Sequence, residues 1–321
     1  VKTRFGEQAR GEAIKTALDE GARHAIEGNN LKLASQPKVD IKSYEENEDL
    51  EASLACEIMP EITVPDLTTL VIEKPRIESA SEEIDDALIS GEINLGIHSL
   101  KDLPTILPKS LKIGAILKRE DYREVIISNK GFKINDLKCG AVIGTSSIRR
   151  KMQLEKLKRK FVIKDIRGNI DTRINKVINK KYDAILLAYA GIKRLGITSK
   201  FNVIDPRIIT PALGQGAIAL VVKKTNFKVN TIIKKLNDTK TALETECERN
   251  FLRALDGNCQ TPVGGYALIK NINGEKKMTF SFKAFSKDGV TLIKDRVCLN
   301  LNNFRSESFK LGVKIKKKIK I

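Results

Sequence analysis

A single cysteine in a glycine-rich loop is the residue of this sequence best placed for covalent chemistry. Cys259 lies within residues 256–266, directly after an amphipathic helical pattern. Gly257 suits the left-handed position that ends such a helix, and we expect Pro262 and the two glycines after it to keep the chain out of regular structure. The thiol is therefore expected on an exposed turn between a helix and a strand, free to react. The alternative is an inert loop cysteine, the more common kind.

Polar and basic side chains are predicted to gather at the carboxyl ends of strands, where α/β sheets place ligands. Lys101 and Asp102 follow one predicted strand, on a turn that two prolines constrain. Hydroxyl side chains follow the next strand at a helix start, where open backbone amides can hold an anion. Five arginines at strand–helix junctions suit bidentate recognition of several carboxylates or phosphates better than solvated surface charge. The hydroxyl residues and arginines are Thr145, Ser146, Ser147, Arg149, Arg150, Arg167, Arg173 and Arg194.

Asp102 differs from these neighbours because it is a carboxylate among cations. That position suits a side chain that stabilises or transfers a positive charge in a ligand with anionic arms; the alternative is a structural partner for Lys101. Gln215 lies in a glycine-rich turn that leads into a strand, which is weak evidence for ligand binding because the phosphate-loop lysine is missing. His98 has an apolar strand behind it, so we expect a structural hydrogen-bonding group rather than a catalytic base.

Composition narrows the class of protein. The chain has 321 residues, enough for two or three domains. No apolar run approaches the roughly 20 residues that span a bilayer, and the N-terminus has no export signal, so we expect a cytoplasmic protein. The five cysteines are scattered without a CxxC pair, and there are two histidines. Neither a disulfide framework nor a metal site is expected from this pattern.

The net charge of +18 is unevenly distributed. Residues 1–86 carry 10 basic and 20 acidic side chains, whereas the rest of the chain carries 48 basic and 20 acidic. Alanine and glutamate dominate early, and lysine, isoleucine and asparagine dominate later. The break suggests two pieces of different origin. The basic piece should favour an anionic partner, either a polycarboxylate or a nucleic acid.

Hydrophobic periodicity predicts a helix, two strands and a second helix in the first quarter of the chain, at 7–27, 50–58, 68–72 and 79–88. From residue 89 the pattern becomes β–α alternation. Strands are expected at 93–97, 141–143, 161–166, 184–188 and 217–222, with helices at 148–160 and from 170. A helix from about 241 to 255, strands at 278–284 and 290–299, and a lysine-rich terminal helix complete the pattern.

Taken together, these segments resemble the hydroxymethylbilane synthase, or porphobilinogen deaminase, family from about residue 82 to the C-terminus. The matching stretches keep the family's order and approximate spacing. They are His98–Pro104, Arg119–Arg123, Gly144–Arg150, Arg167–Asn169, Ala188–Gly196, Gly214–Ala217 and Asn258–Tyr266.

The resemblance implies an α/β fold with two periplasmic-binding-protein-like domains and a small α/β C-terminal domain. The first domain would comprise residues 82–118 and 215–238 and would be incomplete. The second would comprise residues 119–214, and the third residues 239–321. An α+β segment, residues 1–81, would precede them.

The resemblance also implies chemistry. Cys259 would hold a dipyrromethane cofactor through a thioether bond, porphobilinogen units would be added head to tail with loss of ammonia, and the linear tetrapyrrole would be released by hydrolysis. Asp102 and Lys101 would be catalytic. The implied cofactor ligands besides Cys259 are Ser99, Thr145, Ser147, Arg149, Arg150, Arg167 and Gly168, and the implied substrate ligands are Arg173, Arg194 and Gln215. A monomer without metal, nucleic acid or membrane partner is expected.

Two family features do not occur before residue 82: an opening Thr-Arg-x-Ser-x-Leu-Ala turn and a Gly-Gly-Lys-Gly-x-Phe loop. Residues 1–77 instead resemble part of the ribosome-associated domain of trigger factor, a chaperone, without its basic ribosome-contacting loop. Both families can contain a stretch like Glu83–Leu88. Our hypothesis is a chimera joined at that stretch, by gene fusion or sequence-assembly error, in which the incomplete first domain impairs or abolishes activity.

Three other classes of protein stay open from the sequence. A basic nucleic-acid-binding protein is disfavoured because the arginines lack interleaved aromatic residues and no known binding module is present. A chaperone-like binding protein would depend on residues 1–77 alone. A solute-binding protein of the same bilobal fold would leave Cys259 without a purpose.

Overall fold

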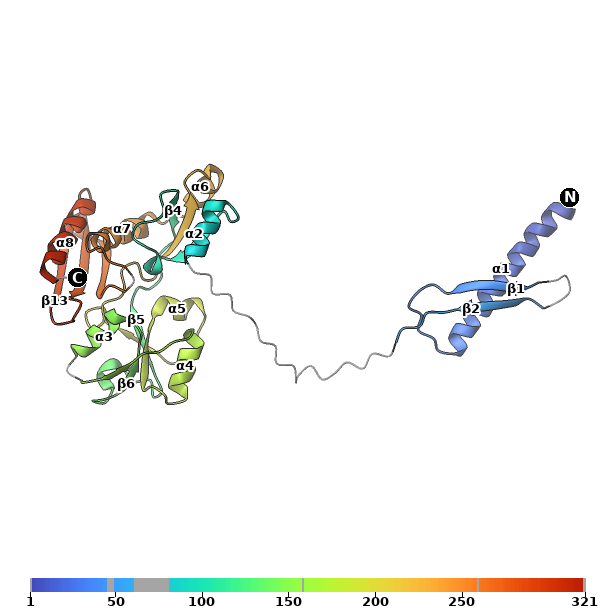
Figure 1. Ribbon diagram of the computed structural model, residues 1–321, viewed down its shortest axis with the longest axis horizontal. Helices are drawn as coiled ribbons and strands as arrows, with labels where there is room; N and C mark the ends of the chain where they lie inside the picture. Colours follow the sequence, from blue (N-terminus) through green and yellow to red (C-terminus); the bar gives the residue numbers. More distant parts are fainter. Residues whose placement is uncertain (1, 45–48, 61–80, 158, 259, 320–321) are drawn as a thin grey trace. The chain divides into compact units, whose positions relative to one another are not determined.

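The computed structural model describes residues 2–44, 49–60, 81–157, 159–258 and 260–319 (Figure 1). The chain divides into two compact units, residues 1–76 and 77–321. Within the described ranges, no helix combines the length and apolar character needed to cross a membrane.

The described part of the first unit contains one long helix and a two-stranded hairpin. Helix α1 (Lys2–Gly28) confirms the helix expected at 7–27 and starts five residues earlier. Strands β1 (Lys38–Ser43) and β2 (Glu51–Ala55) pair antiparallel. Strand β2 corresponds to the strand expected at 50–58 and is shorter than predicted. The strand expected at 68–72 and the helix start at Ser79 lie outside the described residues. No side chain whose burial is described between residues 6 and 60 is fully buried.

The second unit contains three sheets, and we name the part around each sheet a lobe. The first lobe has strands β3 (Gly96–Ser99), β4 (Leu111–Ile116) and β10 (Ile218–Lys223) in the order β3-β10-β4, all antiparallel. Helix α2 (Ser81–Ser90) packs against the β10 face that carries Ala219 and Val221. Helix α6 (Phe227–Lys234) packs against the opposite face, which carries Leu220 and Val222. Both faces of β10 are therefore buried, as its continuous apolar run predicted.

The strand expected at 93–97 begins three residues later, at Gly96. The reason is the end of helix α2, where the N–H groups of Gly91 and Ile93 both donate to the carbonyl of Ala87, at 3.1 and 3.2 Å. Gly91 has a φ of 92°, the left-handed position of a helix-ending turn. Ile93 therefore belongs to the helix end. Strand β3 lies at the edge of its sheet, and Ile97 on it is 63% exposed.

The second lobe has a five-stranded mixed sheet in the order β7-β6-β8-β5-β9. Its strands are β5 (Glu124–Ser128), β6 (Val142–Gly144), β7 (Val162–Lys164), β8 (Ala184–Ala188) and β9 (Asn202–Ile204), and β6 runs parallel to β7 and β8. Helices α3 (Ile148–Glu155), α4 (Ile170–Ile178) and α5 (Tyr189–Arg194) accompany it, with a short 3-10 helix at Ile134–Asp136. Helix α3 ends five residues before its predicted end. Ile178, expected on the buried face of α4, is 60% exposed.

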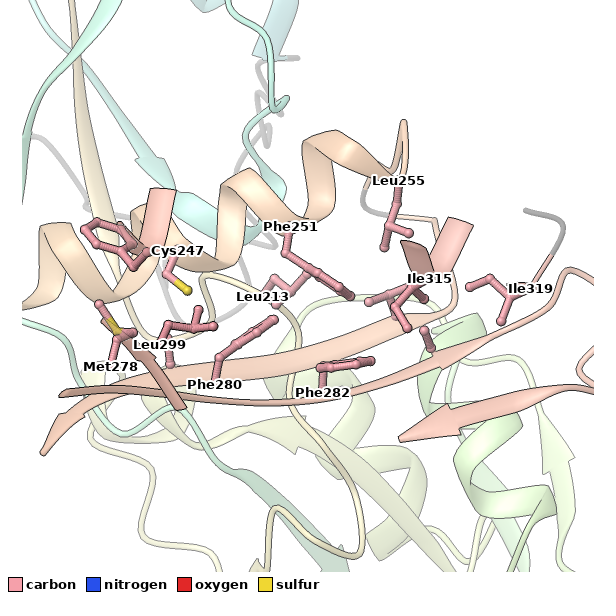
Figure 2. Packing of buried hydrophobic residues seen from close by; sticks show 14 residues of the cluster. Leu213, Cys247, Phe251, Leu255, Met278, Phe280, Phe282, Leu299, Ile315 and Ile319 are labelled. Carbon is pink, nitrogen blue, oxygen red and sulfur yellow. The ribbon is translucent and has the colours of Figure 1, made fainter. Parts of the chain in front are cut away.

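The third lobe is an antiparallel meander covered by two helices. Strands β11 (Val263–Ile272), β12 (Glu275–Phe285) and β13 (Leu292–Asn300) pair in sequence, and helices α7 (Thr239–Ala254) and α8 (Phe304–Ile319) pack together beside them. Figure 2 shows Phe251 of α7 directed toward Phe280 and Phe282 of β12, with ring centroids 5.0 and 4.8 Å away. The predicted helix and both predicted strands are confirmed.

The glycines after Pro262 lie in β11, so the expectation that they keep the chain irregular is wrong. They are needed for close packing between the third and second lobes. A Cβ on Gly264 would lie 2.8 Å from the carbonyl oxygens of Thr210 and Pro211.

One buried carboxylate connects the three lobes. Glu248 of α7 accepts two hydrogen bonds from Arg119, at 2.6 and 3.2 Å, where the chain passes from the first lobe to the second. It also accepts from the N–H of Gly214, where the chain returns, at 2.6 Å, and from the N–H of Ala267 on β11, at 2.8 Å. Its side chain is fully buried and fully hydrogen-bonded, which makes such a charge tolerable in a protein interior.

Candidate active site

Two of the cavities between the lobes share lining residues. The main cavity, about 700 Å³, is bordered by Asp102 from the first lobe, by helix α3 from the second and by Asn258 and residues 260–263 from the third. The inner cavity, about 320 Å³, lies between the first and second lobes. Both volumes are typical of small-molecule sites. Lys101, Asp102, Arg150 and Arg173 border both, so the two cavities form one site.

Lys101 and Asp102 lie on a 3-10 turn (Leu100–Asp102) directly after β3, as expected for residues at a strand end. Leu100 is buried, and its N–H donates to the carbonyl of Ala217 at 3.0 Å. Arg249 of α7 donates to the carbonyls of Leu103 and Pro104, at 3.1 and 2.6 Å. The turn is therefore fixed on both sides while Asp102 stays exposed to the cavities.

Burial lowers the pKa of Lys101, and the nearby Arg150 acts in the same direction, whereas Asp102 and Glu124 oppose the change. Among the ion pairs of the described residues, none joins Lys101 to Asp102. Asp102 nevertheless acts on the pKa of Lys101, so the alternative that it is a structural partner of Lys101 stays a prediction.

Arg149 and Arg150 share a buried carboxylate that the sequence analysis did not single out. Glu124 begins strand β5, is 0% exposed and accepts from Arg149 at 2.8 Å and from Arg150 at 2.7 Å. Arg149 also donates to the carbonyl of Thr210 at 2.6 Å, and Arg150 to that of Leu186 at 3.0 Å. The sequence signal for this buried carboxylate was the position of Glu124 directly before the apolar residues 125–127.

The electrostatic balance of this cluster keeps Glu124 ionised. Burial acts to raise its pKa, but Arg150 and Arg149 outweigh burial and hold the pKa at about 2. Burial lowers the pKa of Arg149, and Glu124 opposes that change. We take all three groups as charged, because one carboxylate faces two guanidinium groups and the cluster keeps a net positive charge beside the cavities.

Other predicted residues reach the inner cavity. Arg173 donates to the carbonyl of Gly168 at 2.7 Å, and burial lowers its pKa. Arg194 donates to the carbonyl of Gly216 at 2.8 Å. Gln215 is 1% exposed and donates to the carbonyl of Tyr122 at 2.9 Å, while its Oε1 has no partner. The predicted residues that border the inner cavity are Ser99, Lys101, Asp102, Arg150, Gly168, Arg173, Arg194 and Gln215.

Two predicted residues border neither cavity. Thr145 is buried, and its Oγ1 accepts from the N–H of Ser147 at 3.3 Å, so it shapes the start of α3. Arg167 is exposed outside both cavities. His98 is buried, and its Nε2 has no hydrogen-bond partner among the described residues.

Cys259 lies outside the described residues, but both of its neighbours, Asn258 and Gln260, border the main cavity. The left-handed residue after helix α7 is Asp256, with a φ of 51°, and Gly257 is not in that conformation. A Cβ on Gly257 would lie 2.4 Å from Cδ1 of Leu252, which explains a glycine at this position. The site thus combines several basic side chains, the exposed carboxylate of Asp102 and the two sequence neighbours of Cys259.

Comparisons with known proteins identify the site. Residues 66–231 match the family model described as "Porphobilinogen deaminase, dipyromethane cofactor binding domain", and residues 242–320 match "Porphobilinogen deaminase, C-terminal domain". The chain belongs to the porphobilinogen deaminase family. It is thereby a hydroxymethylbilane synthase, a transferase of tetrapyrrole biosynthesis whose cofactor is dipyrromethane.

Curated porphobilinogen deaminases are similar to most of the chain. The enzyme of a Nitratiruptor species is 42% identical over 228 residues, covering 70% of this chain and 71% of that protein. The enzyme of Bacillus subtilis (strain 168) is 40% identical over 223 residues, covering 68% of this chain and 69% of that protein.

Solved structures give weaker likenesses. An ancestral cationic amino acid solute binding protein has a TM-score of 0.34 at 11% identity, covering 50% of this chain and 69% of that one. A putative methionine-binding lipoprotein from Bacillus subtilis has a TM-score of 0.34 at 14% identity, covering 52% of this chain and 79% of that one.

The start of the chain matches a different family. Residues 1–90 match the model of "Bacterial trigger factor protein (TF)". This match overlaps the deaminase match over residues 66–90, which contain the stretch Glu83–Leu88. The overlap fits the hypothesis of a junction at a shared stretch.

The residues present fit a dipyrromethane cofactor, which carries several carboxylates. The main cavity is bordered by three arginines and two lysines, and by a single carboxylate among its described lining residues. The buried Nε of Arg150 has no hydrogen-bond partner among the residues that the structure describes.

Proposed function

We propose that the site formed by the two cavities carries out the hydroxymethylbilane synthase reaction, with Asp102 as its catalytic carboxylate. The observation that supports the proposal best is a meeting of three features in the main cavity. Asp102, the residues Arg149 and Arg150, and both neighbours of Cys259 border it. We propose that the domains are 82–118 with 215–238, 119–214 and 239–321, after the segment 1–81; the separate sheets of the three lobes support this division.

In this proposal Cys259 holds the cofactor through a thioether, and porphobilinogen is the substrate. Dipyrromethane, when bound, supplies the pyrrole carbon to which the first porphobilinogen is joined. Cations of the second lobe neutralise the acetate and propionate groups of the rings, since guanidinium groups recognise carboxylates in a bidentate manner. The proposed ligands are Ser99, Thr145, Ser147, Arg149, Arg150, Arg167 and Gly168 for the cofactor, and Arg173, Arg194 and Gln215 for the substrate.

Asp102 has a role that its neighbours cannot fill. Loss of ammonia from porphobilinogen leaves a positive charge on the pyrrole, and joining two rings releases a proton. An exposed carboxylate beside the cavity stabilises the charge and accepts the proton. Lys101, whose pKa burial lowers, exchanges protons more readily than a solvated lysine and assists these transfers.

In this proposal, the excess of basic side chains after residue 86 binds the carboxylate groups of the pyrroles. We propose that the protein acts as a monomer on porphobilinogen and that nucleic acid is not a partner. Five of the basic side chains border the main cavity, where they can bind the carboxylates of a small molecule.

A second candidate is an inactive chimera. Its support is the overlap of the trigger factor and deaminase matches at residues 66–90 and a first-lobe sheet of three strands beside a second-lobe sheet of five. Reading the junction from genomic DNA and from an expressed transcript separates a real fusion from an assembly error.

The mass of the intact purified protein tests the proposal. We expect an increment equal to dipyrromethane that is absent from Cys259→Ser and present in Cys139→Ser, a control at an exposed cysteine. An unmodified wild-type mass together with no turnover of porphobilinogen would contradict the proposed function and favour the inactive chimera.

A further inference from the structure

A lysine in the turn between β12 and β13 borders the main cavity. Lys287 faces this cavity together with Arg149, Arg150 and Arg173 of the second lobe. Among the lining residues that the structure describes, it is the one cation that the third lobe contributes. The third lobe also carries Cys259.

The turn that presents Lys287 is held by its own hydrogen bonds. The N–H of Ser286 donates to the carbonyl of Thr291 at 2.9 Å, and the N–H of Thr291 donates back to Oγ of Ser286 at 2.9 Å. Asp288 accepts from Oγ of Ser286 and from the N–H of Val290. The carboxylate next to Lys287 in sequence is therefore engaged within the turn.

The hairpin is also fixed to the second lobe. A Cβ on Gly289 would lie 3.5 Å from Cε of Met152, so the turn packs against helix α3. Further along β12, Nζ of Lys283 donates to the carbonyls of Arg207 and Ile208, at 2.7 and 2.9 Å. The two contacts fix the position of Lys287 at the rim of the cavity.

Lys287 itself makes no ion pair with another described residue, and its side chain is exposed. We propose that Lys287 binds a pyrrole carboxylate in the main cavity. Because it shares a lobe with Asn258 and Gln260, which border the same cavity, its position relative to them stays constant if the other lobes rearrange. It therefore suits the rings nearest the attachment. This inference rests on the proposed function.

A calorimetric titration with porphobilinogen tests the inference without turnover. It uses the full chain with Cys259→Ser, in which no primer can attach, and compares it with the same chain carrying Lys287→Gln, Lys287→Arg or Lys276→Gln. Lys276 is the matched control, because it is an exposed lysine near the β11–β12 turn of the same lobe and borders neither cavity.

We expect Lys287→Gln to raise the dissociation constant about three- to fivefold, as for an exposed ion pair. Lys287→Arg and Lys276→Gln should stay within about twofold of the parent. Thermal midpoints of all variants should agree, because the side chain is exposed.

Equal affinity in Lys287→Gln and its parent would refute the inference, and so would an equal loss in Lys276→Gln. Failure of the parent to bind porphobilinogen would also overturn it. If the wild-type mass shows no cofactor but porphobilinogen binds in a Lys287-dependent manner, the proposed function fails and the carboxylate site stands.

Discussion

Removing the charge of Glu124 tests whether the buried cluster beneath the cavity is ionised. The substitution Glu124→Gln keeps the shape of the side chain but leaves Arg149 and Arg150 without their shared carboxylate. Both guanidinium groups are more than 90% buried. Two like charges would then face each other in an interior from which water is largely excluded.

The expected loss of stability follows from the pKa of Glu124. Its value of about 2 lies well below the usual 4.5, and the difference corresponds to about 3 kcal/mol of unfolding free energy at neutral pH. Measured losses on breaking one side of a buried ion pair are of the same order, about 3 to 5 kcal/mol. Because the pKa is lowered on folding, this contribution is complete above about pH 4.5 and is lost as the pH falls from 4.5 toward 2.

Thermal unfolding followed by calorimetry measures the effect. For a unit of this size, 3 kcal/mol corresponds to a decrease of about 6 to 12 °C in the midpoint at pH 7. The control is Glu120→Gln, four residues earlier, where an exposed ion pair with Lys193 contributes at most about 1 kcal/mol. Equal midpoints for Glu124→Gln and Glu120→Gln would refute the reasoning.

Two further substitutions test the catalytic carboxylate and the open strand edge. Asp102→Asn should lower kcat at least about 100-fold, because a group that stabilises charge and accepts a proton is lost, and should leave the thermal midpoint unchanged because the side chain is exposed. A variant that keeps a tenth of the wild-type rate would argue against the catalytic role. Ile97→Thr should reduce concentration-dependent light scattering, because it removes an exposed apolar side chain from edge strand β3. Unchanged scattering would show that this edge does not drive association.

The sequence was sufficient to predict the long apolar strands and the residues at their ends. Strands β8 and β10 and helix α7 lie within one or two residues of their expected positions, because continuous apolar runs and i, i+4 spacing have few alternative readings. Asp102 and Arg150 then share a cavity because both follow strands of sheets that meet there.

What could not be predicted depended on tertiary contacts. The pairing of Glu124 with two arginines joins strand β5 to helix α3, some 25 residues apart, and no local pattern encodes it. Gly257 and Gly264 were interpreted as turn residues, but each avoids a clash with a neighbouring segment. Glycine serves both purposes, and the sequence alone does not distinguish them.

The carboxylate of Glu248 has a mechanical consequence for a polymerising enzyme. Both chain crossings between the first and second lobes are hydrogen-bonded to this one side chain, through Arg119 and through the N–H of Gly214. Separating the first and second lobes by translation would break both sets of hydrogen bonds and leave the buried carboxylate of Glu248 without these partners. Rotation about Glu248 would keep these hydrogen bonds. Such a rotation would enlarge the space for a lengthening tetrapyrrole most at the greatest distance from Glu248 and least beside it.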